Sequence, residues 1–337
     1  MVFRRWIMLK MFLTAIASGQ IIMSLCSVVP ATERVFKDAV DGFKCCLVDK
    51  GLFTSTVGPF ILGVGMTLSG SCPGMILIQL GSGCKNSYYT LIGTLVGALL
   101  YSLFAQPLVK YTKPKKALEK PTVGETLGVK FYKLALPMAV MLVISIFLLE
   151  WFINWETDLS PHDLNANTTG TANIMTVRSW PPSVAGVIVG LLQLFIIISV
   201  GDTLGGSSAY VTIVSQWVVT KRLQERFPYM ANARCGIGNW WQVSYVLATV
   251  IGASLSAMSS NSIGDEKGVT IATAITGGIL LLFGARLAAG CTSGHGLSGM
   301  ALLYWLSIVA VPAMFAGGIG TAFAMDATGA LNTYVNH

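Results

Sequence analysis

The sequence predicts an all-α, polytopic membrane protein with about nine transmembrane helices, short re-entrant or broken helices and two pseudo-symmetric halves. Its 337 residues are 53% hydrophobic and only 11% charged, whereas about 25% of the residues in an ordinary soluble domain are charged. The mean hydropathy is +0.67, and several apolar runs approach the roughly 20 residues that one helix needs to cross a bilayer. The alternation typical of strands is absent. Because backbone groups in lipid must be satisfied within the segment, these runs are expected to be helices.

Nine apolar segments are the expected spans. In chain order they cover residues 6–29, 52–70, 88–109, 131–152, 183–200, 207–219, 240–258, 270–289 and 300–325. A single secretory signal peptide does not account for so many apolar segments, so we expect a multi-pass integral protein, placed in the plasma membrane.

The charges of the connecting segments predict the orientation. Residues 110–130 carry six lysines and two glutamates, and the segment that starts at Lys221 is also basic, so both are expected on the cytoplasmic side. Residues 154–180 carry three acidic side chains and one arginine, which places this loop outside. The loop contains an N-glycosylation sequon at Asn167, which agrees with an outer location.

One short motif occurs three times along the chain. The copies are "GMTLSGSC" at 65–72, "GDTLGGSS" at 201–208 and "GARLAAGC" at 284–291. They share glycine at the first position, leucine at the fourth and a thiol or hydroxyl at the eighth, which indicates an internal repeat.

The repeat divides the chain into halves. We expect a first membrane repeat at residues 1–153, an extracellular loop at 154–182 and a second membrane repeat at 183–337. The second repeat holds two copies of the motif and the first repeat holds one, and a fourth copy at the same spacing would fall before Met1. The first repeat is therefore expected to lack its initial motif.

The glycine-rich motifs are expected to interrupt their helices. Each helical glycine costs up to about 1 kcal/mol, and Pro73 also removes a backbone donor. The helices should therefore break at Cys72 and Cys291, and a broken helix at membrane depth must face protein or a wet cavity. Paired discontinuous helices in the two halves are typical of a transport site, with the positive ends of the half-helices directed at an anion.

The residues around these breaks suit a small anion that contains sulfur. Backbone N–H groups and Arg286 would attract its oxygens, and the soft thiols of Cys72 and Cys291 would contact a terminal sulfur. A hard anion such as phosphate would gain little from thiols. The candidate substrate-binding residues are Gly70, Ser71, Cys72, Gly74, Ser208, Arg286, Gly290, Cys291, Thr292, Ser293, Gly294 and His295.

Several of these residues also have a purely structural interpretation. Arg286 could bind carbonyl groups at a helix end instead of an anion. His295 could relay a proton or donate to the anion, but a buried histidine with both nitrogens satisfied is the more common case. Asp202 could pair with Arg286 or mark the path of a coupling ion. The glycine clusters could serve helix packing as well as the site.

The two cysteine motifs, with their continuations "PGMILIQLGSG" and "TSGHGLSG", resemble those of the YeeE/YedE family of sulfur transport proteins, and the resemblance covers most of the chain. It implies an hourglass-shaped membrane protein that takes up thiosulfate past cysteines at a constriction. The cysteines that match are Cys72 and Cys291. The family has a further cysteine motif near its N-terminus, which this sequence lacks, and Cys26 lies in an apolar span without the glycine setting.

The resulting hypothesis is a membrane transporter for thiosulfate or a related sulfur anion, and not an enzyme. The alternative is a membrane thiol oxidoreductase or sulfurtransferase that uses Cys72 or Cys291 as nucleophile. Its expected partners are the sulfur anion, the lipid bilayer and a soluble sulfurtransferase that receives the anion, whereas nucleic acid is not expected. The seven cysteines form no CxxC pair, and the sequence predicts no cofactor and no metal site.

Overall fold

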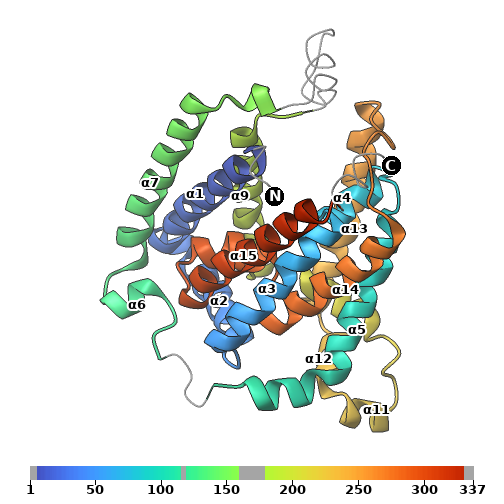
Figure 1. Ribbon diagram of the computed structural model, residues 1–337. Helices are drawn as coiled ribbons and strands as arrows, with labels where there is room; N and C mark the ends of the chain where they lie inside the picture. Colours follow the sequence, from blue (N-terminus) through green and yellow to red (C-terminus); the bar gives the residue numbers. More distant parts are fainter. Residues whose placement is uncertain (1–5, 115–118, 159–178, 330–337) are drawn as a thin grey trace.

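The computed structural model describes residues 6–114, 119–158 and 179–329. Within these ranges the chain is helical, and its one isolated β-bridge joins Thr122 and Tyr304. Eight helices in the described part are long and apolar enough to cross a membrane. They are α1 (Ile7–Val28), α3 (Leu52–Ser69), α5 (Ser87–Thr112), α7 (Phe131–Phe152), α9 (Pro182–Val200), α13 (Ile237–Ser259), α14 (Ile271–Ala288) and α15 (Trp305–Ala327). The predicted fold class is confirmed (Figure 1).

One of the nine expected spans is wrong. The segment 207–219 contains only α10 (Ser207–Val214), a helix of 8 residues, and such a helix is about 12 Å long against a hydrocarbon core of about 30 Å. The expected span at 300–325 also starts later, at Trp305, because Leu303 has a positive φ of 54° and interrupts the helix.

Glycines allow α3 and α14 to pack with their backbones in contact at the centre of the molecule. A Cβ added at Gly65 would lie 2.4 Å from the backbone nitrogen of Leu281, and one added at Gly284 would lie 2.5 Å from that of Leu62. The two helices therefore run antiparallel, with the end of each beside the start of the other. The most extensive helix contacts in the fold join the two halves of the sequence: α3 with α14 and α15, α5 with α14, and α1 with α9.

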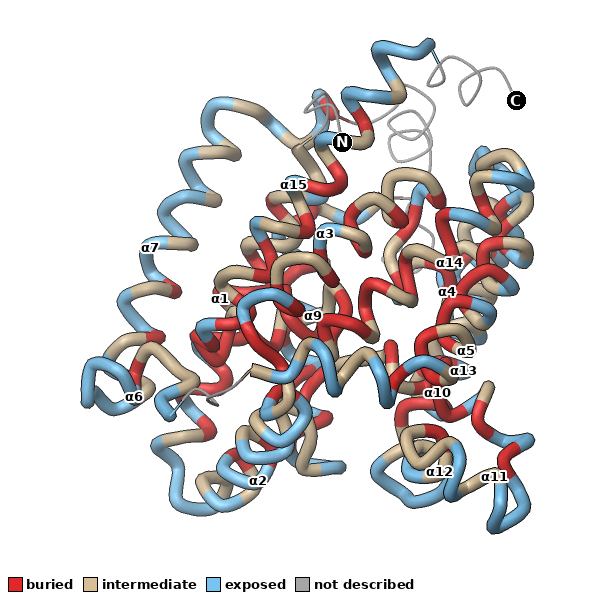
Figure 2. The backbone as a smooth tube through the Cα atoms, turned by 60° about the horizontal axis from the view of Figure 1, so that its bottom comes forward, coloured by how far each residue is buried: buried red, intermediate tan, exposed pale blue. Residues whose placement is uncertain are grey.

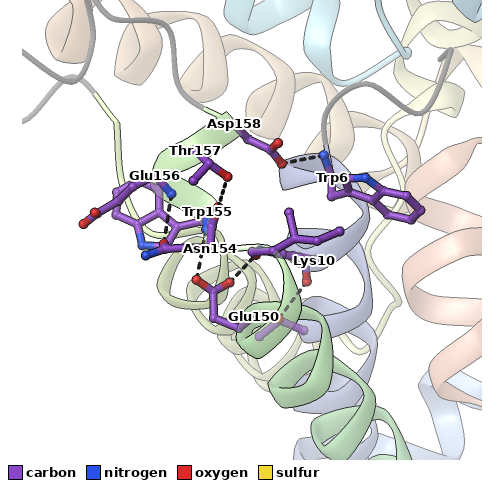
Figure 3. Close-up of polar contacts among 10 residues, drawn as sticks. Trp6, Lys10, Glu150, Asn154, Trp155, Glu156, Thr157 and Asp158 are labelled. Atoms are coloured by element: carbon purple, nitrogen blue, oxygen red, sulfur yellow. Dashed lines mark hydrogen bonds and ion pairs between the residues drawn. The ribbon is translucent and has the colours of Figure 1, made fainter.

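Helix α7 lies at the edge of the bundle and packs against α1 (Figure 1). Most of its surface is exposed, in contrast to the buried stretches of α14 (Figure 2). One end of α7 is fixed by Lys10, whose Nζ donates to Glu150 Oε2 at 2.7 Å and to the carbonyl of Ile153. The same clamp includes the Trp6 N–H, which donates to Asp158 in the 3₁₀ helix η1 (Trp155–Asp158) at 2.6 Å (Figure 3).

The end of the molecule opposite η1 holds four helices that are not candidate spans: α2 (Pro30–Leu47), α6 (Val123–Leu127), α11 (Lys221–Arg226) and α12 (Pro228–Arg234) (Figure 1). Lys44 in α2 pairs with Glu125 in α6 at 2.7 Å. Because the basic segments share this end, it is the end that the sequence places in the cytoplasm. The sequon at Asn167 and most of the expected extracellular loop lie outside the described residues.

All three copies of the repeated motif coincide with a helix break, of which the breaks at Cys72 and Cys291 are the two that the sequence predicts. Helix α3 ends at Ser69, and the seven-residue α4 (Met75–Gly81) follows. Helix α9 ends at Val200, before α10. Helix α14 ends at Ala288, and a π-helix, η2 (Thr292–Gly299), follows. Each first helix stops at a residue in the left-handed region, namely Gly70, Gly201 and Ala289, with φ of 64°, 68° and 62°.

Candidate functional site

The three breaks bring the two motif cysteines together. Cys72 interacts with the backbone N–H groups of Gly74 and Met75, with the hydroxyl of Thr292 and electrostatically with the Cys291 thiol. The first half and the second half of the chain each supply one cysteine, so the site forms only when the two breaks meet. We call Cys72, Cys291 and the groups that contact their sulfur atoms the thiol site.

Cys291 is surrounded by donors from two breaks. Its Sγ lies 3.1 Å from the Ser293 Oγ, and it interacts with the backbone N–H groups of Ser293, Gly294 and Gly206. Gly206 directly precedes α10, so the motif copy without a cysteine also contributes to the site. Cys291 is 2% exposed, whereas Cys72 is half-buried. Access is therefore easier to Cys72 than to Cys291.

Two further features of the thiol site are the sulfur atoms of two methionines and a tyrosine held by a hydrogen bond. The Thr292 hydroxyl lies 3.7 Å from the sulfur atoms of both Met66 and Met314, so four sulfur-containing side chains surround this one loop. Tyr210, in α10, is 1% exposed and donates its hydroxyl to the Pro73 carbonyl at 2.7 Å. This bond fixes α10 against the break that carries Cys72.

Other predicted site residues shape the loops. Gly70 supplies the left-handed turn after α3, and the hydroxyl of Ser71 lies 3.4 Å from that of Ser69. Gly290 leaves room for the His295 ring, because a Cβ there would lie 2.6 Å from the ring. These residues hold the break in place without directing a side chain at either sulfur.

His295 is held on both sides of its ring. Its Nε2 lies 3.1 Å from the Ala288 carbonyl, and its Nδ1 lies 3.0 Å from the Ser307 hydroxyl. A carbonyl only accepts, so Nε2 carries the proton and Nδ1 accepts from Ser307. With 3% exposure and both nitrogens occupied, this arrangement favours the structural interpretation of His295.

Arg286 and Ser208 lie beside the thiol site and contact each other. Arg286 Nη1 donates to the Ser208 Oγ at 3.1 Å, and its Nε donates to the Tyr229 hydroxyl at 3.0 Å. Asp202 does not pair with Arg286, because its carboxylate accepts from the Thr203 N–H and the Trp241 indole.

The residues that the sequence did not single out are Met75, Gly206, Tyr210 and Tyr245, all of which contact or interact with the thiols. The signal for Gly206 was present in the second motif copy, "GDTLGGSS", because the glycine lies directly before the new helix. The eighth position of the second motif copy, where the other two copies have cysteine, pointed to Ser208 instead.

Comparisons with known proteins identify the family. Residues 1–320 match the family model described as "Sulphur transport". The "Thiosulfate transporter TsuA" of Escherichia coli (strain K12) is 26% identical over 271 residues, which cover 78% of this chain and 72% of the relative. The protein of the same name from Spirochaeta thermophila is 24% identical over 277 residues, covering 77% of this chain and 74% of the relative. A "Probable transporter" of Xylella fastidiosa (strain 9a5c) is 28% identical over 150 residues, which cover 43% of this chain and 94% of that protein. Because the family model covers nearly the whole chain and eight helices are long and apolar enough to span a membrane, the protein is a multi-pass integral membrane protein that belongs to the sulphur transport family.

Proposed function

We propose that this protein carries thiosulfate across the membrane through a constriction lined by Cys72 and Cys291. The observation that carries the proposal is the meeting of two thiols, one from each half of the chain, inside two helix breaks rich in backbone N–H groups. The names of the two TsuA relatives support thiosulfate as the substrate.

The chemistry of the thiol site matches the two ends of thiosulfate. The N–H groups of Gly74, Met75 and Gly206 can donate to its oxygens, and the S–H groups of Cys72 and Cys291 can donate to its terminal sulfur. The sulfur atoms of Met66 and Met314 add a polarizable wall. In this mechanism the thiols stay protonated, since a thiolate would repel the anion. Each contact is weak enough to release the anion to the next one.

The test is uptake of radiolabelled thiosulfate by proteoliposomes that contain the purified protein. Cys72→Ser and Cys291→Ser should each lower the uptake rate by roughly tenfold, which corresponds to about 1.4 kcal/mol, because a hydroxyl keeps a donor but loses the soft sulfur. Cys84→Ser and Cys235→Ser are matched controls, since these cysteines lie outside the thiol site, and they should transport at the wild-type rate. Equal uptake by all four variants would contradict the proposal.

Two further measurements test the choice of substrate and the alternative that the protein is a sulfurtransferase. Excess unlabelled sulfate should compete poorly with thiosulfate in wild-type protein, since it lacks a terminal sulfur. Strong competition would mean that the thiols do not select for sulfur. Mass spectrometry during turnover should find Cys72 and Cys291 unmodified, whereas a persulfide on either cysteine would support the sulfurtransferase alternative.

A further inference from the structure

A second polar cluster lies at the C-terminal end of α14, next to the thiol site. Its centre is Arg286, which donates to the Tyr229 hydroxyl from Nε at 3.0 Å and from Nη2 at 2.7 Å. From Nη1 it donates to the hydroxyls of Ser207 and Ser208 at 3.3 and 3.1 Å. All four of these hydrogen bonds end on neutral oxygen atoms.

A second cation lies beside Arg286. The Lys50 side chain donates to the Tyr101 hydroxyl at 3.1 Å and to the Leu287 carbonyl at 3.0 Å. Lys50 is 8% exposed, and its burial together with the nearby charge of Arg286 lowers its pKa to about 8. We call Lys50, Tyr101, Ser207, Ser208, Tyr229 and Arg286 the cation cluster.

No carboxylate in the described part of the chain forms an ion pair with Lys50 or Arg286. Asp49, next to Lys50 in sequence, interacts with it electrostatically, but its ion pair is with Lys113, at 2.7 Å. Buried cations are normally paired, because removing a charge from water is costly. Two neighbouring cations that no carboxylate contacts directly therefore favour an anion that comes from outside the chain.

The hydroxyl groups of the cation cluster also keep their own O–H groups as hydrogen-bond donors. A hydroxyl that accepts from a cation keeps its own O–H as a donor. In the part of the chain that the structure describes, the hydroxyls of Tyr101, Ser207, Ser208 and Tyr229 accept from the two cations but donate to no protein acceptor. An oxyanion, which has several acceptor oxygens and no donor, complements this surplus of donors.

The position of the cluster connects the thiol site with the protein surface. Gly206 faces Cys291, and the next two residues, Ser207 and Ser208, face Arg286. On the other side, Tyr229 lines an open pocket of about 690 Å³, together with Lys110 and Asn232. This pocket belongs to the end of the molecule where α11 and α12 lie, which is the predicted cytoplasmic end (Figure 1).

We propose that the cation cluster is a second anion-binding site, which receives the oxyanion after the thiol site and releases it toward the pocket at Tyr229. This inference rests on the proposed transport function. The cluster has hydroxyl and guanidinium donors but no thiol, so it binds by charge and by oxygen atoms. It therefore binds sulfate and thiosulfate with similar affinity, while the thiol site alone selects for a terminal sulfur.

Sulfate binding to protein without the thiol site tests this inference. The double variant Cys72→Ser/Cys291→Ser keeps the whole cation cluster, and equilibrium dialysis with radiolabelled sulfate should show saturable binding to one site. Adding Tyr229→Phe, which removes one hydroxyl and keeps the ring, should weaken this binding roughly tenfold or more, since a hydrogen bond to a charged group is lost. Adding Arg286→Gln should abolish it.

Two controls separate binding from folding. Arg226→Gln removes a cation from α11 at the same end of the molecule and should leave sulfate binding unchanged. Each variant is checked by size-exclusion chromatography and by its melting temperature. If Arg286→Gln does not fold, Tyr229→Phe and Ser208→Ala carry the test, because both keep the guanidinium and remove only a hydroxyl.

The result that overturns the inference is distinct from the one that overturns the proposed function. Absence of saturable sulfate binding in the double variant, or unchanged binding after Tyr229→Phe and Ser208→Ala, would show that Arg286 only holds α10 and α12 against α14. Neither result depends on thiosulfate transport. Conversely, wild-type thiosulfate uptake by the double variant would contradict the role of the thiols and leave the sulfate result in force.

Discussion

Ala289 is the residue that stops α14, and it does so in a conformation that suits glycine. Its φ is 62°, whereas the breaks after α3 and α9 have glycine at this position. The left-handed region costs a residue with a Cβ about 1–2 kcal/mol, and glycine enters it without this cost. The sequence around the third break, "GARLAAGC", thus keeps the turn but stores some backbone strain in it.

Ala289→Gly should therefore stabilise the folded protein. We expect a gain of about 1 kcal/mol, reduced somewhat by the greater freedom of glycine in the unfolded chain. Thermal unfolding of the detergent-solubilised protein measures the change as a rise in melting temperature. Ala285→Gly is the matched control, since Ala285 lies inside α14, where glycine costs about 1 kcal/mol, and its melting temperature should fall. A fall for both variants would show that the backbone at Ala289 is unstrained.

Single residues also show how far sequence reasoning reached into the site. Cys72, Cys291 and the 292–294 segment could be predicted as a candidate site because a thiol at a fixed motif position coincides with a helix break. The direction of a side chain after a break could not be identified. Arg286 lies five positions before Cys291, but its guanidinium donates to the Tyr229 hydroxyl, which comes from α12, a helix distant in sequence. Tertiary contacts of this kind have no local signal.

At the scale of elements, the antiparallel pairing of α3 with α14 frames the thiol site. The two breaks lie at opposite ends of this pair, and the segment after α14 reaches back along α3, where Thr292 contacts Met66 and Cys72. The glycines at the contact let the backbones approach until a single added carbon would overlap the neighbouring chain. Small residues serve this purpose in membrane helices, where lipid is as apolar as leucine and close packing drives association.

A methyl group at this contact should weaken the bundle. In Gly65→Ala the added Cβ would lie 2.4 Å from the Leu281 nitrogen, and overpacking of this kind typically costs about 1–3 kcal/mol. We expect a lower melting temperature and slower thiosulfate uptake, because separating α3 from α14 also moves Cys72 from Cys291. Gly320→Ala, in α15, is the matched control: no atom lies within 4 Å of its added Cβ, and its stability should be equal or higher. If Gly65→Ala matched this control in stability and uptake, close α3–α14 packing would not position the cysteines.

The elements also show why one predicted span was wrong. Residues 207–219 are apolar, and composition alone does not distinguish a short helix that ends inside the protein from one that crosses the bilayer. The polar residues Ser215 and Gln216 end α10, and the Gln216 side chain donates to the carbonyls of Thr212 and Arg234. Hydropathy detected the eight long helices, and the length of α10 depended on contacts with α12.

At the scale of the whole molecule, the two halves of the sequence interlock. The largest contacts join α3 with α14, α3 with α15, α5 with α14 and α1 with α9, and the two helices of each pair come from opposite halves. The cysteine motif of the first half finds a partner in the second half, since Cys72 meets Thr292, whereas Cys291 meets Gly206 from another break of its own half. The thiol site is therefore a property of the assembled bundle, and the clamp of Lys10, Glu150 and Asp158 fixes the outermost helix to it (Figure 3).

The number of spans between Glu156 and Cys235 decides whether these two residues lie on opposite sides of the membrane. Labelling of cysteines can measure this. Glu156 lies at the end that we place outside, and the exposed Cys235 follows α12 at the basic end. Helix α9 crosses between them, and α10 is too short to cross again. In intact cells, a membrane-impermeant maleimide should therefore label Glu156→Cys but not Cys235.

Permeabilising the cells should expose Cys235, Cys45 and Cys46 to the reagent, and replacing these three exposed cysteines with serine should remove that added signal. The outcome separates eight spans from nine, because a further crossing at 207–219 would move Cys235 to the same side as Glu156. Labelling of both positions from outside would support that ninth span. Labelling of Cys235 alone would mean that the bundle is inverted, and the pocket at Tyr229 would then be an entrance from outside and not an exit to the cytoplasm.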